Sequence, residues 1–397
     1  MIKISEYAQR IEESATMAIS ARAKAMKKAG ENVVAMAAGE PDFDTPAHIV
    51  AAAKQALDEG FTRYTPASGM PELRAAWAGQ VGGSRGVSYE ANQLIVTAGG
   101  KQAIYNIVYA LAGPGDEVII LAPYWVSYPE QVRAVGATPV VLEASAEQDF
   151  KISPDALRQA ITDRTRLLIL NSPSNPTGSV YSRDELTGLA EVLVEKQVPV
   201  ISDEVYDALV YGEEFASIAS LGEEIYNLTI VSGAVSKTYA MTGWRIGYAV
   251  GPAEVIAAAG RLQSHSTSGA NSAAQKGALA AITGDQSTVE SMRQEFDRRR
   301  QYMLQRLRAM PDITCPEPHG AFYAFPRIAA YFGRRCDGEV VDGSMAFSSL
   351  FLGHEKVATV PGLAFGDDGH VRLSYATGMA QIEEAMDRME RFLSRLA

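Results

Sequence analysis

Apolar and polar positions follow two different periods along the middle of the chain. Short apolar runs that predict β-strands lie at 94–98, 117–121, 138–142, 167–170 and 198–202. Stretches of helical periodicity lie between them, at about 101–111, 126–135, 154–162 and 183–196. Strands that alternate with helices are typical of a mostly parallel sheet with helices on both faces. The pattern therefore predicts an α/β fold for this part of the chain.

The pattern at the two ends is different. Residues 4–28 show helical periodicity, which we interpret as an arm, and further helices are expected at 47–59 and 71–80. The chain is again helical from 252 to 310, including a long amphipathic stretch at 289–308 that is suited to bridging two domains. The tail mixes strand signals with helical ones, which predicts a helix-covered antiparallel sheet: strands at 321–325, 356–360 and 370–375, helices at 344–352 and 379–396.

This change of pattern predicts a large and a small domain. We expect an N-terminal arm and part of the small domain in 1–45, a large domain in 46–290, and a small C-terminal α+β domain in 291–397. With 397 residues, 47% of them hydrophobic and 21% charged, the chain can bury a large core and does not resemble a disordered protein.

The charge balance bears on possible partners. A net charge of -11 argues against binding to nucleic acid or to an anionic membrane, because either would require a basic face. Three consecutive arginines, Arg298 to Arg300, lie in a helix of mixed charge and are interpreted as a solvated face.

Cysteine and histidine positions do not suggest a metal site. Cys315 and Cys336 lack metal-ligand spacing, and the five histidines are scattered. We see neither a signal peptide nor an apolar run long enough to span a membrane. These features predict a soluble, cytoplasmic protein without a metal centre.

One run, 232–248, carries the most distinctive chemistry. Lys237 lies between Ser236 and Thr238 inside an otherwise apolar, hairpin-like segment, where little water would reach its ammonium group. Desolvation lowers the pKa of a lysine and makes its amine nucleophilic near neutral pH. Arg245 adds a guanidinium that suits a phosphate. The run is a candidate seat for a phosphorylated aldehyde such as pyridoxal phosphate, although a solvated loop lysine is the alternative.

Other distinctive residues fall at the carboxyl ends of predicted strands, where ligands bind in open α/β sheets. Gly99 and Gly100 precede a helix, so they predict either an anion site or a plain tight turn. Asp203 ends an apolar strand, and a buried carboxylate requires a positive partner such as a pyridinium nitrogen. Tyr206 could then reach a ring oxygen. The alternative for Asp203 is a helix cap.

Three further residues allow two interpretations each. Trp125 could stack on an aromatic cofactor or belong to the core. Asn175 lies between two prolines and is either fixed for binding or a turn residue. Arg372 lies in a terminal apolar strand and requires a carboxylate, either of a substrate or of a structural salt bridge. Neither a dinucleotide glycine fingerprint nor a Gly-Lys-Ser/Thr phosphate loop is present.

Taken together, these motifs resemble one family along nearly the whole chain: the class I/II, fold-type I pyridoxal-phosphate aminotransferases, and most closely their bacterial aspartate aminotransferase branch. The resemblance rests on 38–44, 99–102, 123–125, 175–178, 202–204, 236–237 with Arg245, and 372–375.

The resemblance implies a large domain with a mostly parallel sheet sandwiched by helices, and a smaller α+β domain. It implies an L-amino acid:2-oxo acid transaminase that works by ping-pong half-reactions through pyridoxamine phosphate, with 2-oxoglutarate as acceptor. It also implies a homodimer with shared active sites.

The resemblance assigns a role to each site residue. Lys237 would form the imine with the cofactor and move the proton at the substrate α-carbon. The cofactor ring would be held at its nitrogen by Asp203, at its oxygen by Tyr206 and Asn175, and on its face by Trp125. The phosphate would be held by Gly99, Gly100, Lys101, Ser236 and Arg245, and by Tyr64 of the partner subunit. The substrate α-carboxylate would be held by Gly39, Trp125, Asn175 and Arg372.

One departure concerns the substrate. Relatives that act on dicarboxylates such as prephenate carry a basic residue just before the Ser14-Ala15-Thr16 triplet, whereas Glu12 and Glu13 stand here. This leaves aspartate or prephenate open against an aromatic or neutral donor. A carbon–sulfur lyase on the same fold and a non-catalytic, cofactor-sensing regulator are the alternative functions.

Overall fold

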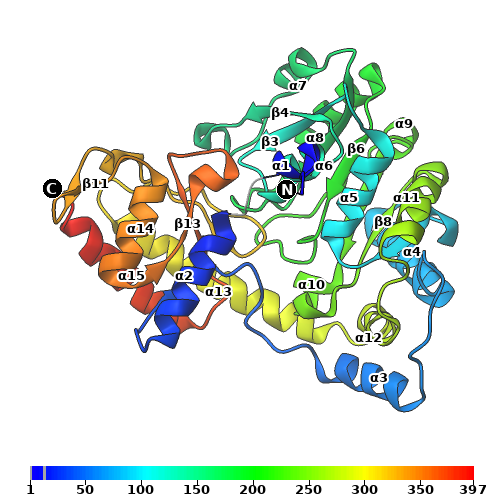
Figure 1. Cartoon of the computed structure of the whole chain (residues 1–397), viewed down its shortest axis with the longest axis horizontal. Helices are drawn as coiled ribbons and strands as arrows, with labels where there is room; N and C mark the ends of the chain where they lie inside the picture. Colours follow the sequence, from blue (N-terminus) through cyan, green and yellow to red (C-terminus); the bar gives the residue numbers. More distant parts are fainter. Residues whose placement is uncertain (1, 12–14) are drawn as a thin grey trace.

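The computed structural model describes residues 2–11 and 15–397. Figure 1 shows two groups of elements: a large sheet with its helices on one side, and the C-terminal elements on the other. Helix α2 (Ala15–Lys28) lies with the C-terminal group, and α13 (Ser287–Ala309) runs from one group to the other. The amphipathic stretch expected at 289–308 is thus one long helix, and the periodicity at 4–28 gives a second, short helix, α1 (Glu6–Gln9), besides α2. The N-terminal arm and the bridging of two domains stay predictions.

The large sheet has seven strands in the order β2-β8-β7-β6-β5-β3-β4. All neighbouring pairs are parallel except the two made by β8 with β2 and with β7, so the predicted mostly parallel sheet is confirmed. The strands are β2 Leu94–Thr97, β3 Glu117–Ala122, β4 Thr138–Glu143, β5 Thr165–Asn171, β6 Val200–Asp203, β7 Thr229–Ala234 and β8 Gly247–Val250.

Both faces of this sheet are buried. In β3, Val118 and Ile120 belong to one hydrophobic core and Ile119 to another, because successive side chains of a strand point to opposite faces. The helices of this part of the chain are α3 Ala47–Asp58, α4 Pro71–Arg85, α5 Gly100–Leu111, α6 Ser127–Ala134, α7 Pro154–Ala160, α8 Arg183–Lys196, α9 Glu223–Tyr226, α11 Ala253–Ser266 and α12 Ser272–Thr283.

Helix α4 is longer than its apolar pattern indicates. It continues from the expected end near residue 80 to Arg85 and stops where Gly86 adopts a left-handed conformation with φ of 69°. Glycine is the residue that ends helices in this way, because it has no Cβ to clash. Because the helix is longer, its last residue, Arg85, reaches Glu204, which directly follows β6 of the large sheet.

The C-terminal elements form small sheets covered by helices. An antiparallel sheet joins β13 (Val360–Pro361), β14 (Val371–Ser374) and β9 (Tyr323–Ala324). The remaining elements are β1 Val34–Ala35, β10 Arg335–Cys336, β11 Glu339–Val340, β12 Val357–Ala358, α14 Ser344–Glu355 and α15 Met379–Ser394.

The run at 356–360, which we expected to form one strand, is divided between two sheets. β12 pairs in parallel with β1 from the N-terminal segment, whereas β13 pairs with β14. Met36, just after β1, also belongs to the same hydrophobic core as Phe347 of α14. These contacts support placing the N-terminal segment in the small domain, and the division at 45/46 and 290/291 remains a prediction.

The arginine run on α13 is not a solvated face. Arg299 and Arg300 are buried, Arg299 in ion pairs with Asp42 and Glu295, and Arg300 in ion pairs with Asp297 and Glu317. Acidic partners satisfy both guanidinium groups, which a buried cation requires. Our interpretation was therefore wrong for these two arginines.

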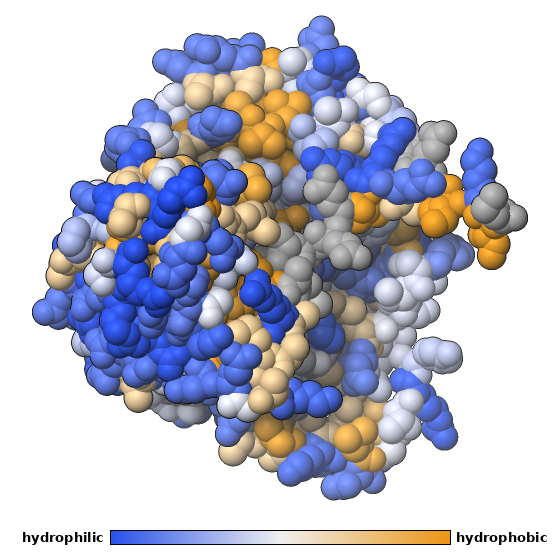
Figure 2. Space-filling model, turned by 60° about the vertical axis from the view of Figure 1, so that its left-hand side comes forward, coloured by the Kyte–Doolittle hydropathy of each residue, from blue (hydrophilic) through white to orange (hydrophobic). Residues whose placement is uncertain are grey.

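The surface agrees with the composition. Figure 2, which brings the C-terminal elements forward, shows mostly hydrophilic residues with apolar ones in separate groups. None of the helices in the described part of the chain combines the length and apolarity needed to cross a bilayer.

The buried face of α13 allows a test of the core. Met303 is 0% exposed there, and Met303→Ala should lower the free energy of unfolding by about 2–5 kcal/mol, because it removes buried apolar contacts and leaves a cavity. The matched control is Met345→Ala, since Met345 is 45% exposed on α14 and should change stability by less than about 0.5 kcal/mol. Urea unfolding of both variants measures the difference, and equal midpoints would contradict this packing.

Candidate active site

A cavity of about 410 Å³ opens at the carboxyl ends of the large sheet's strands and extends to the C-terminal sheet. This volume is typical of ligand sites. All of the site residues expected from the sequence line it except Gly99 and Tyr64: Gly39, Gly100, Lys101, Trp125, Asn175, Asp203, Tyr206, Ser236, Lys237, Arg245 and Arg372. The structure thus brings together residues that are far apart in the sequence, up to the 333 positions that separate Gly39 from Arg372.

Lys237 lies on a short helix, α10 (Val235–Thr238), that directly follows β7. β7 and β8 pair in antiparallel fashion, so the expected hairpin is confirmed. Lys237 Nζ donates to the carbonyl oxygen of Gly39. The pKa of Lys237 is lowered to about 8, chiefly by burial and also by the positive charges of Arg372 and Arg245, while Glu40 and Asp203 oppose the shift. A desolvated amine with this pKa is a nucleophile near neutral pH, which disfavours the solvated loop lysine.

Asp203 ends β6 and is buried. Its Oδ2 accepts a hydrogen bond of 2.6 Å from the hydroxyl of Tyr128, and its Oδ1 has a longer contact of 3.4 Å with the backbone N–H of Val205. Burial raises the pKa of Asp203 to about 6, and the hydrogen bond from Tyr128 opposes this shift. The chain beyond Asp203 forms turns rather than a helix, so a helix cap does not explain this carboxylate.

Arg372 reaches the cavity from β14 and is buried as well. Its Nη1 donates to Oδ1 of Asn175 at 2.8 Å and its Nη2 to the carbonyl oxygen of Ala37 at 3.0 Å. Its Nε is buried without a hydrogen-bond partner. Burial lowers the pKa of Arg372. Within the described chain these acceptors are neutral, which disfavours a structural salt bridge and leaves a cation suited to an incoming carboxylate.

The aromatic side chains around Arg372 fix its position. Its guanidinium lies 4.3 Å from the ring centre of Tyr323 and 5.1 Å from that of Phe365. The hydroxyl of Tyr323 is 3.0 Å from the hydroxyl of Tyr206. Cation–π contacts of this kind hold a guanidinium without neutralising it.

A second group of cavity residues consists of glycine and cationic residues: Gly100, Lys101 and Arg245 line the cavity, and Gly99 lies next to them. Gly99 has a φ of 87°, and a Cβ on it would lie 2.4 Å from Nη2 of Arg245. Gly100 begins α5, so the free N–H groups of that helix face the same region. Lys101 Nζ lies 4.8 Å from the ring centre of Trp125, and burial and then Arg245 lower the pKa of Lys101. The two cations and the helix N-terminus are chemically suited to an anion.

Two expected residues lie elsewhere. Gly99 lies against the guanidinium of Arg245 and does not line the cavity. Tyr64 is 99% exposed and does not line the cavity of its own chain, and its role toward a partner subunit stays a prediction. Glu12, Glu13 and Ser14, on which the substrate departure rests, lie outside the described residues, and the side chains of Ala15 and Thr16 are not described either.

Sequence reasoning missed other residues that line the cavity: Tyr128, Asn171, Thr242, Tyr323 and Phe365. Tyr128 could have been found, because it stands in the helix expected at 126–135, three positions after the candidate residue Trp125. Asn171 accepts from the Asn175 N–H and donates to the Asp203 carbonyl at 2.9 Å each.

A potential metal-ligand group also escaped the sequence reasoning. Ligand atoms of Cys336, Asp337 and His354 lie within 4.8 Å of one another. Asp337 already forms an ion pair of 2.8 Å with Arg395. The absence of a metal centre therefore stays a prediction.

The donor set fits pyridoxal phosphate. The buried carboxylate of Asp203 can meet a protonated ring nitrogen, the amine of Lys237 can meet an aldehyde, and the cations beside Gly100 can meet a phosphate. The ring of Trp125 supplies a flat wall. These three kinds of group, each costly to bury alone, have counterparts on this cofactor, whereas Arg372 is left for a substrate carboxylate.

Comparison with known proteins agrees with this geometry. A family model described as aminotransferase class I and II matches residues 31–389. Aspartate aminotransferase of Streptomyces avermitilis is 45% identical over 99% of this chain and 97% of its own length. Aspartate/prephenate aminotransferase of Cereibacter sphaeroides is 44% identical over the full length of both chains.

Solved structures show the same fold. Aspartate aminotransferase from Rhizobium meliloti superimposes with a TM-score of 0.97 at 39% identity over 100% of both chains. The Thermus thermophilus aspartate aminotransferase with maleate gives a TM-score of 0.93 at 41% identity, over 98% of this chain and 100% of that one. These relatives favour transamination over the lyase and the regulator. The chain therefore belongs to the class I and II aminotransferases and is a pyridoxal 5'-phosphate-dependent transaminase of fold type I.

Proposed function

We propose that this transaminase takes the amino group of L-aspartate and passes it to 2-oxoglutarate. The observation that carries action on an α-amino acid is the buried guanidinium of Arg372, whose hydrogen bonds go to the neutral oxygens of Asn175 and Ala37 and which is therefore ready for the α-carboxylate that every such donor has. The names of relatives with 43–45% identity support aspartate as the donor.

Pyridoxal phosphate supplies an aldehyde that takes up the amino group and a ring that accepts the electron pair released at the substrate α-carbon. Lys237 Nζ is the base that removes and returns the α-proton, for which burial has lowered its pKa to about 8. It enters the cavity beside the Gly39 carbonyl, on the same side as the substrate carboxylate site.

Asp203 holds a proton on the ring nitrogen. With Oδ2 occupied by the Tyr128 hydroxyl, Oδ1 is the oxygen that can face the ring, because its contact with the Val205 N–H is long. A pKa raised to about 6 leaves Asp203 ionised at neutral pH, so it can form an ion pair with a ring N–H.

The remaining contacts orient the ring and the substrate. Tyr206 and the Asn175 amide would bind the ring oxygen, and Trp125 would cover the ring face. Arg372 and Asn175 hold the α-carboxylate from a strand outside the large sheet, so substrate binding joins the two groups of elements. The phosphate is held by the N-terminus of α5 and by Lys101, Ser236 and Arg245.

An aromatic or neutral donor is the second candidate. It is favoured by Glu12 and Glu13, which stand where dicarboxylate-specific relatives carry a basic residue, and by the aromatic walls formed by Trp125, Tyr323 and Phe365. The names of the relatives favour the dicarboxylate instead.

A donor panel decides between these candidates. Holoenzyme is mixed with L-aspartate, L-phenylalanine or L-alanine, and conversion of the cofactor from aldehyde to amine form is followed by absorbance in single turnovers. We expect the highest ratio of rate to half-saturating concentration for L-aspartate, and recovery of the aldehyde form on addition of 2-oxoglutarate. A higher ratio for L-phenylalanine would replace aspartate by the second candidate.

The role of Arg372 gives a separate prediction. Arg372→Gln should lower kcat/KM by roughly 30- to 5000-fold, which corresponds to the 2–5 kcal/mol lost when one partner of a buried charged pair is removed. Arg388→Gln is the matched control, because Arg388 is a buried arginine on α15 that pairs with Glu384 and does not line the cavity. Cofactor affinity should stay unchanged in both. A loss of cofactor with intact donor binding would contradict the assignment.

We also propose that the enzyme is a cytoplasmic homodimer. Its two cysteines, Cys315 and Cys336, are free and buried, which fits a reducing compartment. Large apolar side chains at Leu57, Tyr64 and Tyr109 are exposed, and a second copy could cover them. Tyr64 would then bind the phosphate of the neighbouring site.

Sedimentation of the holoenzyme at micromolar concentration should give twice the mass of the 42.6 kDa chain. Tyr64→Phe should remain dimeric, since only a hydroxyl is lost, but should bind the cofactor several-fold more weakly because that hydroxyl would face the phosphate. A monomeric, fully active wild type would refute the shared site.

A further inference from the structure

A second cavity, of about 240 Å³, lies behind the segments that carry the active-site residues. Ala234 lines both cavities. Glu204 and Thr238, which line the second cavity, are the chain neighbours of Asp203 and Lys237, which line the first. The segments 203–207 and 234–238 therefore separate the two cavities. A contact that fixes the side of a segment facing the second cavity also fixes the active-site residues on its other side.

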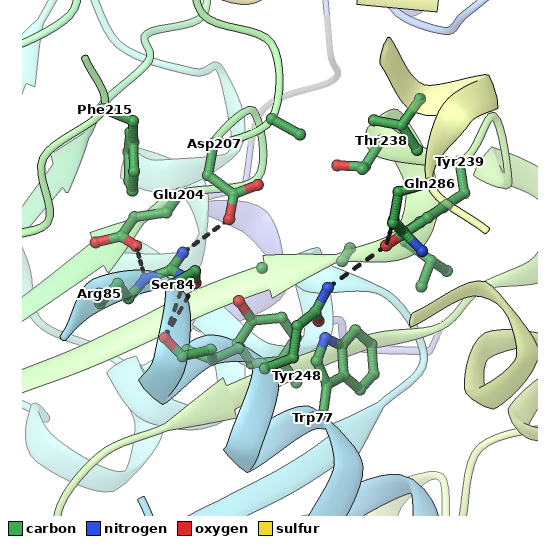
Figure 3. Close-up of a pocket in the computed structure, with 17 residues that line it drawn as sticks. Trp77, Ser84, Arg85, Glu204, Asp207, Phe215, Thr238, Tyr239, Tyr248 and Gln286 are labelled. Carbon is green, nitrogen blue, oxygen red and sulfur yellow. Dashed lines mark hydrogen bonds and ion pairs between the residues drawn. The ribbon is translucent and has the colours of Figure 1, made fainter. Parts of the chain in front are cut away.

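Arg85, the last residue of α4, lies on this rear side, as Figure 3 shows. Its Nε is 2.6 Å from Oε2 of Glu204, and its Nη2 is 2.8 Å from Oδ2 of Asp207. Its Nη1 donates to Oγ of Ser84 at 2.8 Å. The side chains of Arg85 and Glu204 are almost fully buried. One guanidinium thus connects two carboxylates.

The two carboxylates occupy particular places in the chain. Glu204 follows Asp203, and Asp207 follows Tyr206. Asp203 and Tyr206 line the active-site cavity, whereas Glu204 and Asp207 line the cavity behind it. Arg85 therefore holds segment 203–207 at two points, each next to a residue that we assign to the cofactor ring.

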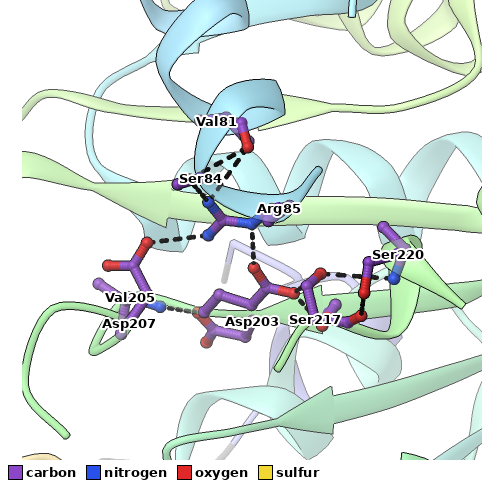
Figure 4. A network of polar contacts seen from close by, with 11 residues as sticks. Val81, Ser84, Arg85, Asp203, Val205, Asp207, Ser217 and Ser220 are labelled. Carbon is purple, nitrogen blue, oxygen red and sulfur yellow. Dashed lines mark hydrogen bonds and ion pairs between the residues drawn. The ribbon is translucent and has the colours of Figure 1, made fainter. Parts of the chain in front are cut away.

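Further hydrogen bonds make this attachment rigid. Oε1 of Glu204 accepts from Ser202 Oγ at 2.8 Å and from Ser217 Oγ at 2.6 Å. Figure 4 shows Ser217 in the same polar network as Arg85 and Asp207. The N–H of Glu204 donates to the Ser232 carbonyl at 2.9 Å. A buried carboxylate with so many donors has a single favourable position, and removal of its cation leaves an unpaired buried charge that the segment must move to relieve.

We propose that Arg85 is a positioning residue for transamination, which orients Asp203 and Tyr206 toward the cofactor by clamping Glu204 and Asp207 from behind. The inference rests on the roles proposed above for Asp203 and Tyr206. Arg85 itself touches neither substrate nor cofactor.

A comparison within the molecule provides the control. Arg300 is also a buried arginine with two carboxylate partners, Asp297 and Glu317. None of these three residues lines the active-site cavity. Arg300→Gln should therefore lower stability without changing the reaction, whereas Arg85→Gln should change both.

The test measures single-turnover kinetics of the holoenzyme with its best donor. In Arg85→Gln the maximal rate should fall about 10- to 100-fold, the range expected from a misplacement of catalytic groups of about 1 Å. The half-saturating donor concentration should stay within about threefold, because Arg372 holds the carboxylate from a separate strand. Arg85→Lys, which keeps the charge, should recover part of the rate.

A second measurement does not depend on turnover. Apoenzyme titrated with pyridoxal phosphate should show a dissociation constant several-fold higher for Arg85→Gln than for wild type, because a misdirected Asp203 loses its ion pair with the ring. Arg300→Gln should bind like wild type. Melting temperatures of the three proteins show how much of any change is loss of fold.

The outcomes separate the possibilities. If Arg85→Gln lowers the melting temperature as Arg300→Gln does but keeps the wild-type rate and cofactor affinity, Arg85 is a structural staple only and the inference is wrong. If Arg85→Gln does not fold, Asp207→Asn decides, since it leaves the Glu204 pair intact and should still lower the maximal rate without raising the half-saturating concentration. An unchanged rate in Asp207→Asn would then overturn the inference.

Asp203→Asn is measured alongside. If Asp203→Asn keeps the full rate, the role of Asp203 fails and the proposed mechanism with it. If Asp203→Asn is inactive and Arg85→Gln is not impaired, only the positioning role of Arg85 fails.

Discussion

The active site depends on three charged groups that are buried in one cavity, where their hydrogen bonds within the described residues go to neutral partners. Lys237, Asp203 and Arg372 are all withdrawn from water in one cavity, where burial shifts each pKa toward the neutral form. Such burial costs several kcal/mol per ion unless a partner compensates. A phosphorylated pyridine aldehyde and a substrate carboxylate supply those partners. Their binding therefore recovers free energy that burial of the three charged groups costs during folding.

The scaffold holds these groups apart until a ligand arrives. Asp203 ends a parallel strand of the large sheet, Lys237 follows the next strand, and Arg372 comes from the small antiparallel sheet. The rigid strands keep the three side chains from collapsing onto one another. From behind, the buried network of Arg85 and Glu204 holds the segment that carries Asp203. The position of Asp203 thus depends both on the active-site cavity, which it lines, and on the second cavity, where its neighbour Glu204 pairs with Arg85.

The local pattern of apolar residues predicted most of the large sheet, because the periods of strands and helices can be recognised within short runs of consecutive residues. Motifs at the ends of the strands predicted most of the cavity. Contacts between distant positions were not predictable in this way. The hydroxyl pair of Tyr206 and Tyr323, and the burial of Arg299 by Asp42, depend on tertiary neighbours that no short pattern shows. The same holds for the division of 356–360 between two sheets, since β1 lies more than three hundred residues away.

The account depends most directly on which amine meets the cofactor. Reduction of the holoenzyme with borohydride, followed by proteolysis and mass spectrometry, fixes the cofactor to the residue that carries it. We predict a single reduced adduct on Lys237 and an unmodified Lys101, although both lysines line the cavity. An adduct on any other lysine, or none in fully loaded protein, would contradict the assignment of this site.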